Sequence, residues 1–303
     1  MAKRDFVRIW DFSKDEVLGV INRALELKRS KTWEKKFADK IMGLLFEKPS
    51  TRTRISFEAA MIKWGGSSIF MSSKELQLVR GEPVKDTARV LSRYLDIVVL
   101  RTYKQETIEE FAKYSPIPVI NGLSDKFHPC QVLSDIMTVI EAGKDIYRDK
   151  IVWIGDGNNV AQSWIEASSL LGFKLFLACP KGFEPDETLI KETKEKFTLN
   201  LEITNDPKEV IKNAEVINTD VWVSMGQEEE KNKRIIAFKE FQVNEKLLEL
   251  ASPSSIVLHC LPAHRGEEIT EEVLEGPKSL VWEQAENKMW LHMALIEFLL
   301  ENS

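Results

Sequence analysis

Short apolar runs alternate with stretches of helical periodicity along almost the whole chain, and this alternation limits the folds that the chain can adopt. Near-continuous Val, Ile and Leu runs linked by helices are typical of parallel sheets that helices cover on both faces. Strands are predicted over residues 41–46, 68–71, 97–100, 119–120, 151–155, 175–179, 201–204, 216–219, 256–260 and 280–282. A first helix is predicted after a capping box at Ser13 and Glu16, and others over residues 53–63, 84–94, 106–113, 131–141 and 285–300.

The predicted strands form two series, with a break near residues 138–150. A chain of 303 residues is long enough for two domains that each bury a core. The sequence therefore predicts an α/β fold of two doubly wound parallel-sheet domains joined by interdomain helices. The pattern of the last helix fits either domain. We place residues 1–137 and 286–303 in the first domain, and residues 138–285 in the second.

Composition narrows the class of protein and its location. A net charge of −6, with 43% apolar and 30% charged residues, fits a globular protein and argues against a general nucleic-acid binder. Cys130, Cys179 and Cys260 have neither the number nor the spacing of a disulfide framework or a CxxC metal pair. The N-terminus acquires acids too early for a secretory signal, and no apolar run has the length of a membrane span. We therefore expect a cytoplasmic protein.

A polar cluster, STRTR, stands between the first predicted strand and the helix that follows it. The free N–H groups and the dipole of a helix N-terminus favour an anion there. The hydroxyls of Ser50, Thr51 and Thr53 can donate to that anion, and Arg52 and Arg54 can add planar guanidinium forks. Ser or Thr also caps many helices, but two arginines among three hydroxyls exceed what a cap requires. The cluster therefore predicts an oxyanion site.

Two further clusters follow strands of the first series. Arg101 comes directly after the apolar strand 97–100, where a buried arginine can be either functional or a salt-bridged edge residue. The motif HPCQ opens the helix near residue 131. His128 could donate to a polarised carbonyl oxygen, and Gln131 could hold an amide. Alone, His128 would more often be an ordinary hydrogen-bonded side chain.

The second series begins with GDGNNVA, which invites a dinucleotide-binding interpretation. That interpretation is weak, because Val160 occupies the position of the third glycine and the next strand ends without a ribose-binding acid. Asn159 is better interpreted as an amide available to a carboxylate. Asp220 closes the strand 216–219 and Ser224 follows closely, a combination that suits an ammonium group. A capping Asp with a solvated Ser is the simpler alternative.

The last cluster, HCLPAHRG, ends the strand 256–260. Cys260 alone would be an inert buried thiol, and no Ser-His-Asp or Cys-His-Asn pattern makes it a nucleophile. His259 and His264 lack the spacing of a zinc site, so no metal is predicted.

In combination, STRTR, HPCQ, DVWVSMGQE and HCLPAHRG resemble the aspartate/ornithine carbamoyltransferase family, and the SMG and HCLP elements resemble its ornithine branch. The similarity runs from about residue 46 to the C-terminal helix. It implies a first domain for carbamoyl phosphate, a second for ornithine, and a homotrimer with active sites between domains and near a neighbouring subunit. It implies carbamoyl transfer to the δ-amine of L-ornithine, giving L-citrulline and phosphate, with no cofactor. Arginine biosynthesis is the implied pathway, although the sequence alone does not separate it from arginine breakdown.

The resemblance also implies roles for individual residues, all numbered in this sequence. The residues that it implies for carbamoyl phosphate are Ser50, Thr51, Arg52, Thr53, Gln77, Arg101, His128, Gln131, Cys260, Leu261 and Lys288. Those that it implies for ornithine are Asn159, Asp220, Ser224 and Met225, with Cys260 and Leu261 beside the δ-amine. Thr53, Arg101, His128 and Cys260 would be catalytic. Gln77 would reach the site of an adjacent subunit.

Two positions depart from the family pattern. Val79 stands where relatives usually have glycine, and Lys288 stands where they typically have an arginine that touches carbamoyl phosphate. Lysine keeps the charge but loses the bidentate fork. These two departures keep open a noncatalytic paralogue that binds carbamoyl phosphate. Within the enzyme class, the alternatives are a carbamoyltransferase for putrescine or for an N-acylated ornithine.

Overall fold

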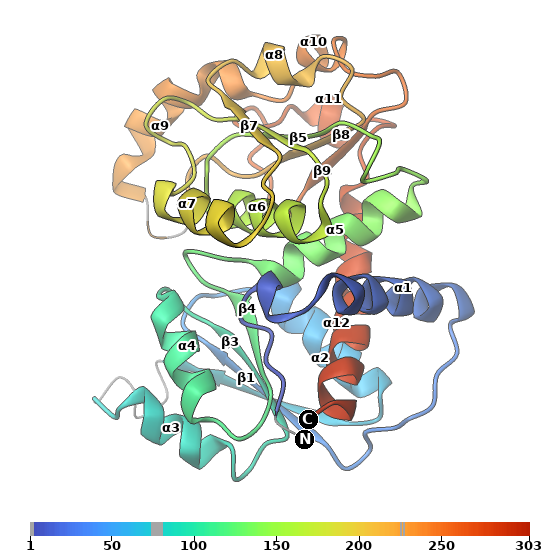
Figure 1. Cartoon of the computed structure of the whole chain (residues 1–303), viewed down its shortest axis with the longest axis vertical. Coiled ribbons are helices and arrows are strands. Elements are labelled where there is room, and N and C mark those ends of the chain that lie inside the picture. Colours follow the sequence, from blue (N-terminus) through green and yellow to red (C-terminus); the bar gives the residue numbers. More distant parts are fainter. Residues whose placement is uncertain (1–2, 74–80, 225, 227) are drawn as a thin grey trace. The chain divides into compact units, whose positions relative to one another are not determined.

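A computed structural model describes residues 3–73, 81–224, 226 and 228–303 of the chain. The chain divides into two compact units, one of Met1–Met137 with Glu286–Ser303 and the other of Thr138–Ala285. Each unit holds one parallel sheet (Figure 1). The predicted fold class, two parallel-sheet α/β domains, is therefore confirmed.

The first unit is built on a four-stranded sheet in the order β2-β1-β3-β4. Helices α3 and α4 cover one face of this sheet, and α1, α2 and α12 lie on the other (Figure 1). Its elements are α1 (Lys14–Ser30), β1 (Ile41–Phe46), α2 (Arg52–Lys63), β2 (Ser67–Ser72), α3 (Val84–Leu91), β3 (Ile97–Arg101), α4 (Gln105–Tyr114), β4 (Val119–Leu123), the start of α5 (Pro129–Glu141) and most of α12 (Val281–Glu301).

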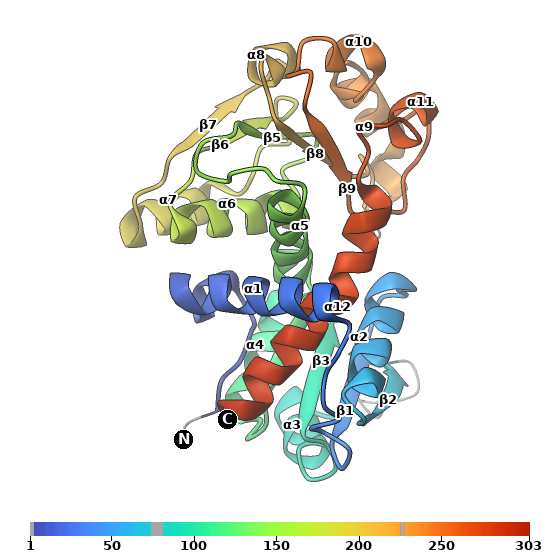
Figure 2. The same ribbon diagram turned by 90° about the vertical axis from the view of Figure 1, so that its right-hand side faces the viewer.

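The second unit has a five-stranded sheet in the order β7-β6-β5-β8-β9. Helices α6 and α7 cover one face, and α8, α10 and α11 cover the other (Figure 2). Its elements are β5 (Ile151–Ile154), α6 (Asn159–Leu171), β6 (Leu175–Ala178), α7 (Glu187–Lys196), β7 (Leu201–Thr204), α8 (Pro207–Ile211), β8 (Val216–Thr219), α9 (Lys231–Phe238), α10 (Glu245–Leu248), β9 (Ile256–His259) and α11 (Glu271–Leu274), with short 3₁₀ turns at Glu228–Glu230 and Lys239–Phe241.

The strand order places two topological switch points at known positions in the sequence. In the first sheet, the chain winds outward in opposite directions from the adjacent strands β1 and β3, and in the second from β5 and β8. Ligands of open parallel sheets bind outside the carboxyl ends of such strand pairs. STRTR follows β1 and Arg101 ends β3, while GDGNN follows β5 and Asp220 follows β8. The topology therefore selects the same clusters that the sequence did.

Local chemistry explains most of the boundaries. Ser13 and Glu16 form the predicted capping box at the start of α1. The predicted strand 280–282 is wrong, because α12 begins at Val281 and the pairing with β9 is an isolated bridge between Ser279 and Val257. Val281 and Gln284 are buried whereas Trp282 is exposed, which is a helical periodicity. Among the described residues, no helix is both long and apolar enough to cross a membrane.

Candidate active site

The N-terminus of α2 carries an unusual charge pattern. Thr51 is its N-cap residue, yet the Thr51 side chain makes no capping hydrogen bond, and the first turn contains no acid. The backbone N–H of Thr53 instead donates to Oγ of Ser50 at 3.2 Å. Arg52, the first residue of the helix, is half-buried. Because cations oppose the helix dipole at this end, the pattern is favourable only when an anion binds.

The two arginines of STRTR do not share one role. The Nε atom of Arg54 donates to Glu58 at 3.0 Å, one turn further along α2. Its guanidinium also lies 3.7 Å from the centre of the Phe70 ring. In this structure the side chain of Arg54 is held against Glu58 and β2, so its contacts do not support the expectation that it adds a second fork to the anion site. Arg52 keeps that prediction.

Lys288 joins two motifs that lie far apart in the sequence. Its ammonium donates to Oγ1 of Thr53 at 3.2 Å and to Oε1 of Gln131 at 2.9 Å. All three side chains are buried, with Lys288 only 4% exposed. Helix α12 thus brings a cation to the meeting point of the α2 N-terminus and the first turn of α5. Lysine does the bridging here at the position where an arginine was expected.

Arg101 and His128 complete the cationic cluster of the first unit. Both are buried, Arg101 at the end of β3 and His128 directly before α5. Burial holds the pKa of His128 well below its usual value, and the nearby cations Lys288 and Arg101 lower it further. His128 is therefore a neutral imidazole near pH 7. The cluster combines two positively charged donors, Arg101 and Lys288, with the neutral donor His128, beside the N-terminus of α2.

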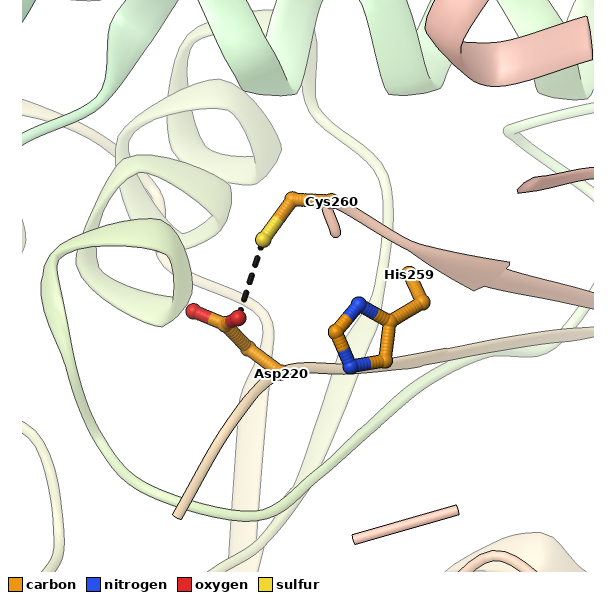
Figure 3. Close-up of side chains that lie close together, drawn as sticks. All are labelled: Asp220, His259 and Cys260. Carbon is orange, nitrogen blue, oxygen red and sulfur yellow. Dashed lines mark hydrogen bonds between the residues drawn. The ribbon is translucent and has the colours of Figure 1, made fainter. Parts of the chain in front are cut away.

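The second unit gathers a carboxylate, an amide and a thiol after β5, β8 and β9. Asp220 is buried, and its Oδ2 accepts a hydrogen bond from Nδ2 of Asn158 at 2.8 Å. Its Oδ1 accepts from Sγ of Cys260 at 2.9 Å (Figure 3). The Oδ1 of Asn158 also accepts from the first N–H groups of α6. Asn158 therefore fixes Asp220 and caps the helix at once.

The turn after β9 is held by a buried histidine and glutamate. Nδ1 of His259 accepts a hydrogen bond from the N–H of Leu261 at 2.8 Å, and Nε2 lies 2.9 Å from Oε1 of Glu268. This tautomer leaves Nε2 as the donor. Leu261 adopts a left-handed φ of 57°, which is costly for a branched residue. Asp220, His259 and Cys260 lie close together (Figure 3), but both ring nitrogens of His259 are engaged, so this cluster does not fit a metal.

A buried ion pair anchors the segment that follows Asp220. Nη1 of Arg234 on α9 donates to Oδ2 of Asp156 at 2.8 Å and to the carbonyl oxygen of Trp222 at 2.9 Å. Burial raises the pKa of Asp156 to about 6, although Arg234 opposes the shift. In the same GDGNN turn, a Cβ at Gly157 would lie 2.3 Å from the backbone nitrogen of Pro185. Close backbone packing therefore explains this glycine without a dinucleotide.

The predicted site residues divide into groups by position. Thr53, Arg101, His128, Gln131 and Lys288 meet in one cluster, with Ser50, Thr51 and Arg52 at its helix mouth. Asp220 and Cys260 meet in the other, while Asn159, Ser224 and Leu261 are half-buried nearby in sequence. Gln77, Val79 and Met225 lie outside the described residues.

Sequence reasoning missed Asn158, which contacts Asp220, and the His259–Glu268 pair. The signal for Asn158 was available, because Asn is a preferred N-cap residue and stands directly before α6. No local pattern pointed to Glu268.

The structure therefore combines two parallel-sheet α/β units, one with a buried cationic cluster and the other with a carboxylate–thiol pair. Two family models cover the chain: the carbamoyl-P binding domain of the aspartate/ornithine carbamoyltransferases matches residues 4–141, and their Asp/Orn binding domain matches residues 148–299. The chain belongs to the aspartate/ornithine carbamoyltransferase family, as its motifs predicted.

Individual relatives are similar over nearly their whole length. The ornithine carbamoyltransferase of Geobacter metallireducens is 50% identical over 98% of this chain and 99% of its own. The solved ornithine carbamoyltransferase of Pyrococcus furiosus is 42% identical, with a TM-score of 0.94 over 100% of this chain and 98% of its own. An anabolic ornithine carbamoyltransferase from Campylobacter jejuni is also 42% identical, with a TM-score of 0.92 over 98% of each chain.

Proposed function

We propose that this protein transfers the carbamoyl group of carbamoyl phosphate to the δ-amine of L-ornithine, giving L-citrulline and phosphate. Family membership and relatives that act on ornithine support the reaction. The observation that carries the proposal is the Lys288 ammonium, which joins Thr53 of the α2 mouth to Gln131 of the HPCQ motif inside one buried cluster. Arg101 and His128 belong to the same cluster.

The phosphate of carbamoyl phosphate binds at the N-terminus of α2. Ser50, Thr51 and Thr53 supply hydroxyls there, and the backbone N–H groups supply further donors. Arg52 adds a guanidinium at the first position of the helix, and Gln77 completes the contact set by analogy with the family. The phosphate stays bound at the N-terminus of α2 while the amine attacks the carbamoyl carbon. The phosphate is then released as the leaving group.

The carbonyl of the carbamoyl group faces Arg101, His128 and Thr53. These groups donate to the oxyanion that forms when the amine attacks, and loss of one such donor typically costs about 3–4 kcal/mol of transition-state stabilisation. The depressed pKa of His128 suits it to donate as a neutral imidazole. Lys288 contributes its charge beside Thr53, and Gln131 binds the amide nitrogen of the carbamoyl group.

Ornithine binds to the second unit. Asp220, Asn159, Ser224 and Met225 hold its α-amino and α-carboxylate groups, and Cys260 with Leu261 lies beside its δ-amine. A free alkylamine has a pKa of about 10.4, so only about one in 2,500 is neutral at pH 7, a penalty of about 4.6 kcal/mol. The amine must lose a proton before it attacks. Turnover is therefore expected to rise through the alkaline range, and a flat profile from about pH 6 to 9 with rate-limiting chemistry would contradict this step.

We also propose a homotrimer. Ile55 and Ile62 on α2 are 54% and 61% exposed, seven residues apart on one face, and Ile69 on the neighbouring β2 is 48% exposed. Exposed apolar side chains in such a group suit contact with another copy of the chain. Sedimentation equilibrium of the full chain tests this, and a monomeric mass at micromolar concentration would refute it.

The anabolic description of the Campylobacter jejuni relative favours arginine biosynthesis over arginine breakdown for this chain. The cytoplasmic location stays a prediction from the sequence. The decisive experiment is a colorimetric citrulline assay with carbamoyl phosphate and, in parallel, ornithine, putrescine and N-acetylornithine. Of the three amines, only ornithine is expected to give product rapidly. Preference for either other amine, or no product from any, would overturn the proposal.

A further inference from the structure

The side chain of Gln131 lies between two groups of opposite hydrogen-bonding character. Its Oε1 accepts from the ammonium of Lys288 at 2.9 Å, and its Nε2 donates to Oδ1 of Asp135 at 2.8 Å. Asp135 stands one turn further along α5 and has no exposed surface, and Gln131 is only 2% exposed. Both hydrogen bonds are therefore shielded from water, and the geometry of a hydrogen bond matters most in such a buried environment.

This arrangement determines which way the amide points. The two ends of a glutamine amide have nearly the same shape, so the surrounding donors and acceptors must select its orientation. An ammonium can only donate, and an ionised carboxylate can only accept. The reversed amide would place an NH₂ group against Lys288 and an oxygen against Asp135. Only the observed orientation satisfies both neighbours.

The orientation also determines what Gln131 presents to a ligand. The ammonium that binds Oε1 of Gln131 also binds Oγ1 of Thr53, so this oxygen lies on the side of the α2 mouth. Arg101 and Lys288 offer only donors in this cluster. The NH₂ of a carbamoyl group is itself only a donor and needs an acceptor, whereas the methyl of an acetyl group needs none.

We propose that Asp135 is a positioning residue that, together with Lys288, fixes the oxygen of Gln131 towards the ligand and so makes the site select carbamoyl phosphate over acetyl phosphate. The inference rests on the proposed carbamoyl-phosphate site and extends it to a residue that does not contact the ligand. A hydrogen-bonding site of this kind rejects an analogue that lacks the matching group.

Two stable analogues test the inference without turnover. Phosphonoacetamide carries the terminal amide, and 2-oxopropylphosphonate replaces its NH₂ with CH₃. In calorimetry, the unsubstituted protein is expected to bind the amide at least about tenfold more tightly, the value of roughly one buried hydrogen bond. Equal affinities for the two analogues would overturn the inference. Citrulline formation in the same preparation shows separately whether the proposed function holds.

Asp135→Asn keeps the shape of the side chain but lets residue 135 donate as well as accept. Affinity for phosphonoacetamide is expected to fall about tenfold, with less than about a twofold change for 2-oxopropylphosphonate. Asp15→Asn, an exposed carboxylate on α1, is the matched control and should change neither. A merely structural role would weaken both analogues by the same factor, which would overturn the proposal. If the Asn variant does not fold, the ratio of the affinities for the two analogues is measured in Asp135→Ser instead.

Discussion

Lys288→Met is the most informative single substitution, because Lys288 is both buried and different from the residue expected in the family. Methionine keeps the length of the side chain and removes the ammonium. The hydrogen bonds to Thr53 at 3.2 Å and to Gln131 at 2.9 Å are then lost, together with one positive charge in the proposed carbamoyl-phosphate site. A charged hydrogen bond is worth about 1.5–3 kcal/mol, so affinity for carbamoyl phosphate should fall roughly 10- to 150-fold.

The stability of the fold should respond much less. Burial of an ammonium carries a desolvation cost of several kcal/mol, which the two hydrogen bonds offset in the folded protein. Methionine removes the cost and the bonds together, so the free energy of unfolding should change by no more than about 1 kcal/mol. A large loss of affinity with a nearly unchanged urea midpoint would place the function of Lys288 in binding and not in folding.

The assay is the citrulline reaction, with the KM for each substrate measured at saturating concentrations of the other. The KM for carbamoyl phosphate should rise while that for ornithine stays nearly constant. Lys113→Met, which removes an exposed lysine on α4, controls for the general effect of one lost charge. A KM for carbamoyl phosphate within about threefold of the unsubstituted protein, at unchanged kcat, would refute the role given to this ammonium.

Three further substitutions address other parts of the protein. Arg52→Ala should weaken carbamoyl phosphate far more than ornithine, and equal losses in calorimetry would contradict the division between the two units. Burial holds the pKa of His292 well below its usual value, and Lys288 lowers it further. On acidification, this histidine is therefore protonated in the unfolded chain before it is protonated in the folded protein. Stability consequently falls as the pH drops below about 6.5. His292→Phe should flatten that decline by up to about 1.4 kcal/mol per pH unit in urea titrations, and an unchanged slope would show that the ring is already charged. Asp156, with a pKa of about 6, anchors Arg234. Protonation of Asp156 should raise the KM for ornithine between pH 7 and 5, and Asp156→Asn should show a high KM without that pH step.

The sequence predicted the features that depend on local pattern and chain order. Apolar runs located the strands, and the polar clusters lie where they were predicted, at the carboxyl ends of β1, β3, β5 and β8. These succeed because the carboxyl end of a parallel strand is a fixed place in the fold. The strand predicted at 280–282 failed, because a short apolar run does not by itself separate a strand from the first turn of a buried helix.

Contacts between distant segments could not be predicted in the same way. In the sequence, Asp135 is an ordinary polar residue of α5. Its significance appears only in the structure, where it accepts a hydrogen bond from the Gln131 amide, which Lys288 also contacts. Glu268 becomes significant only because it lies 2.9 Å from the ring of His259. Arg54 matched the anion-site pattern as well as Arg52 did, and the sequence pattern did not show that Arg54 would contact Glu58. Pairwise geometry, which no local spacing encodes, decides each of these cases.

Lys288 and Thr53 are 235 positions apart, and this separation has a consequence for synthesis. While the ribosome is still translating the second unit, the four strands of the first sheet have been synthesised, but α12, which carries Lys288, has not. A nascent or prematurely ended polypeptide therefore cannot form the complete cluster of Lys288, Thr53 and Gln131, however well its early strands have paired. The proposed carbamoyl-phosphate site is therefore complete only in molecules whose translation has passed that final helix.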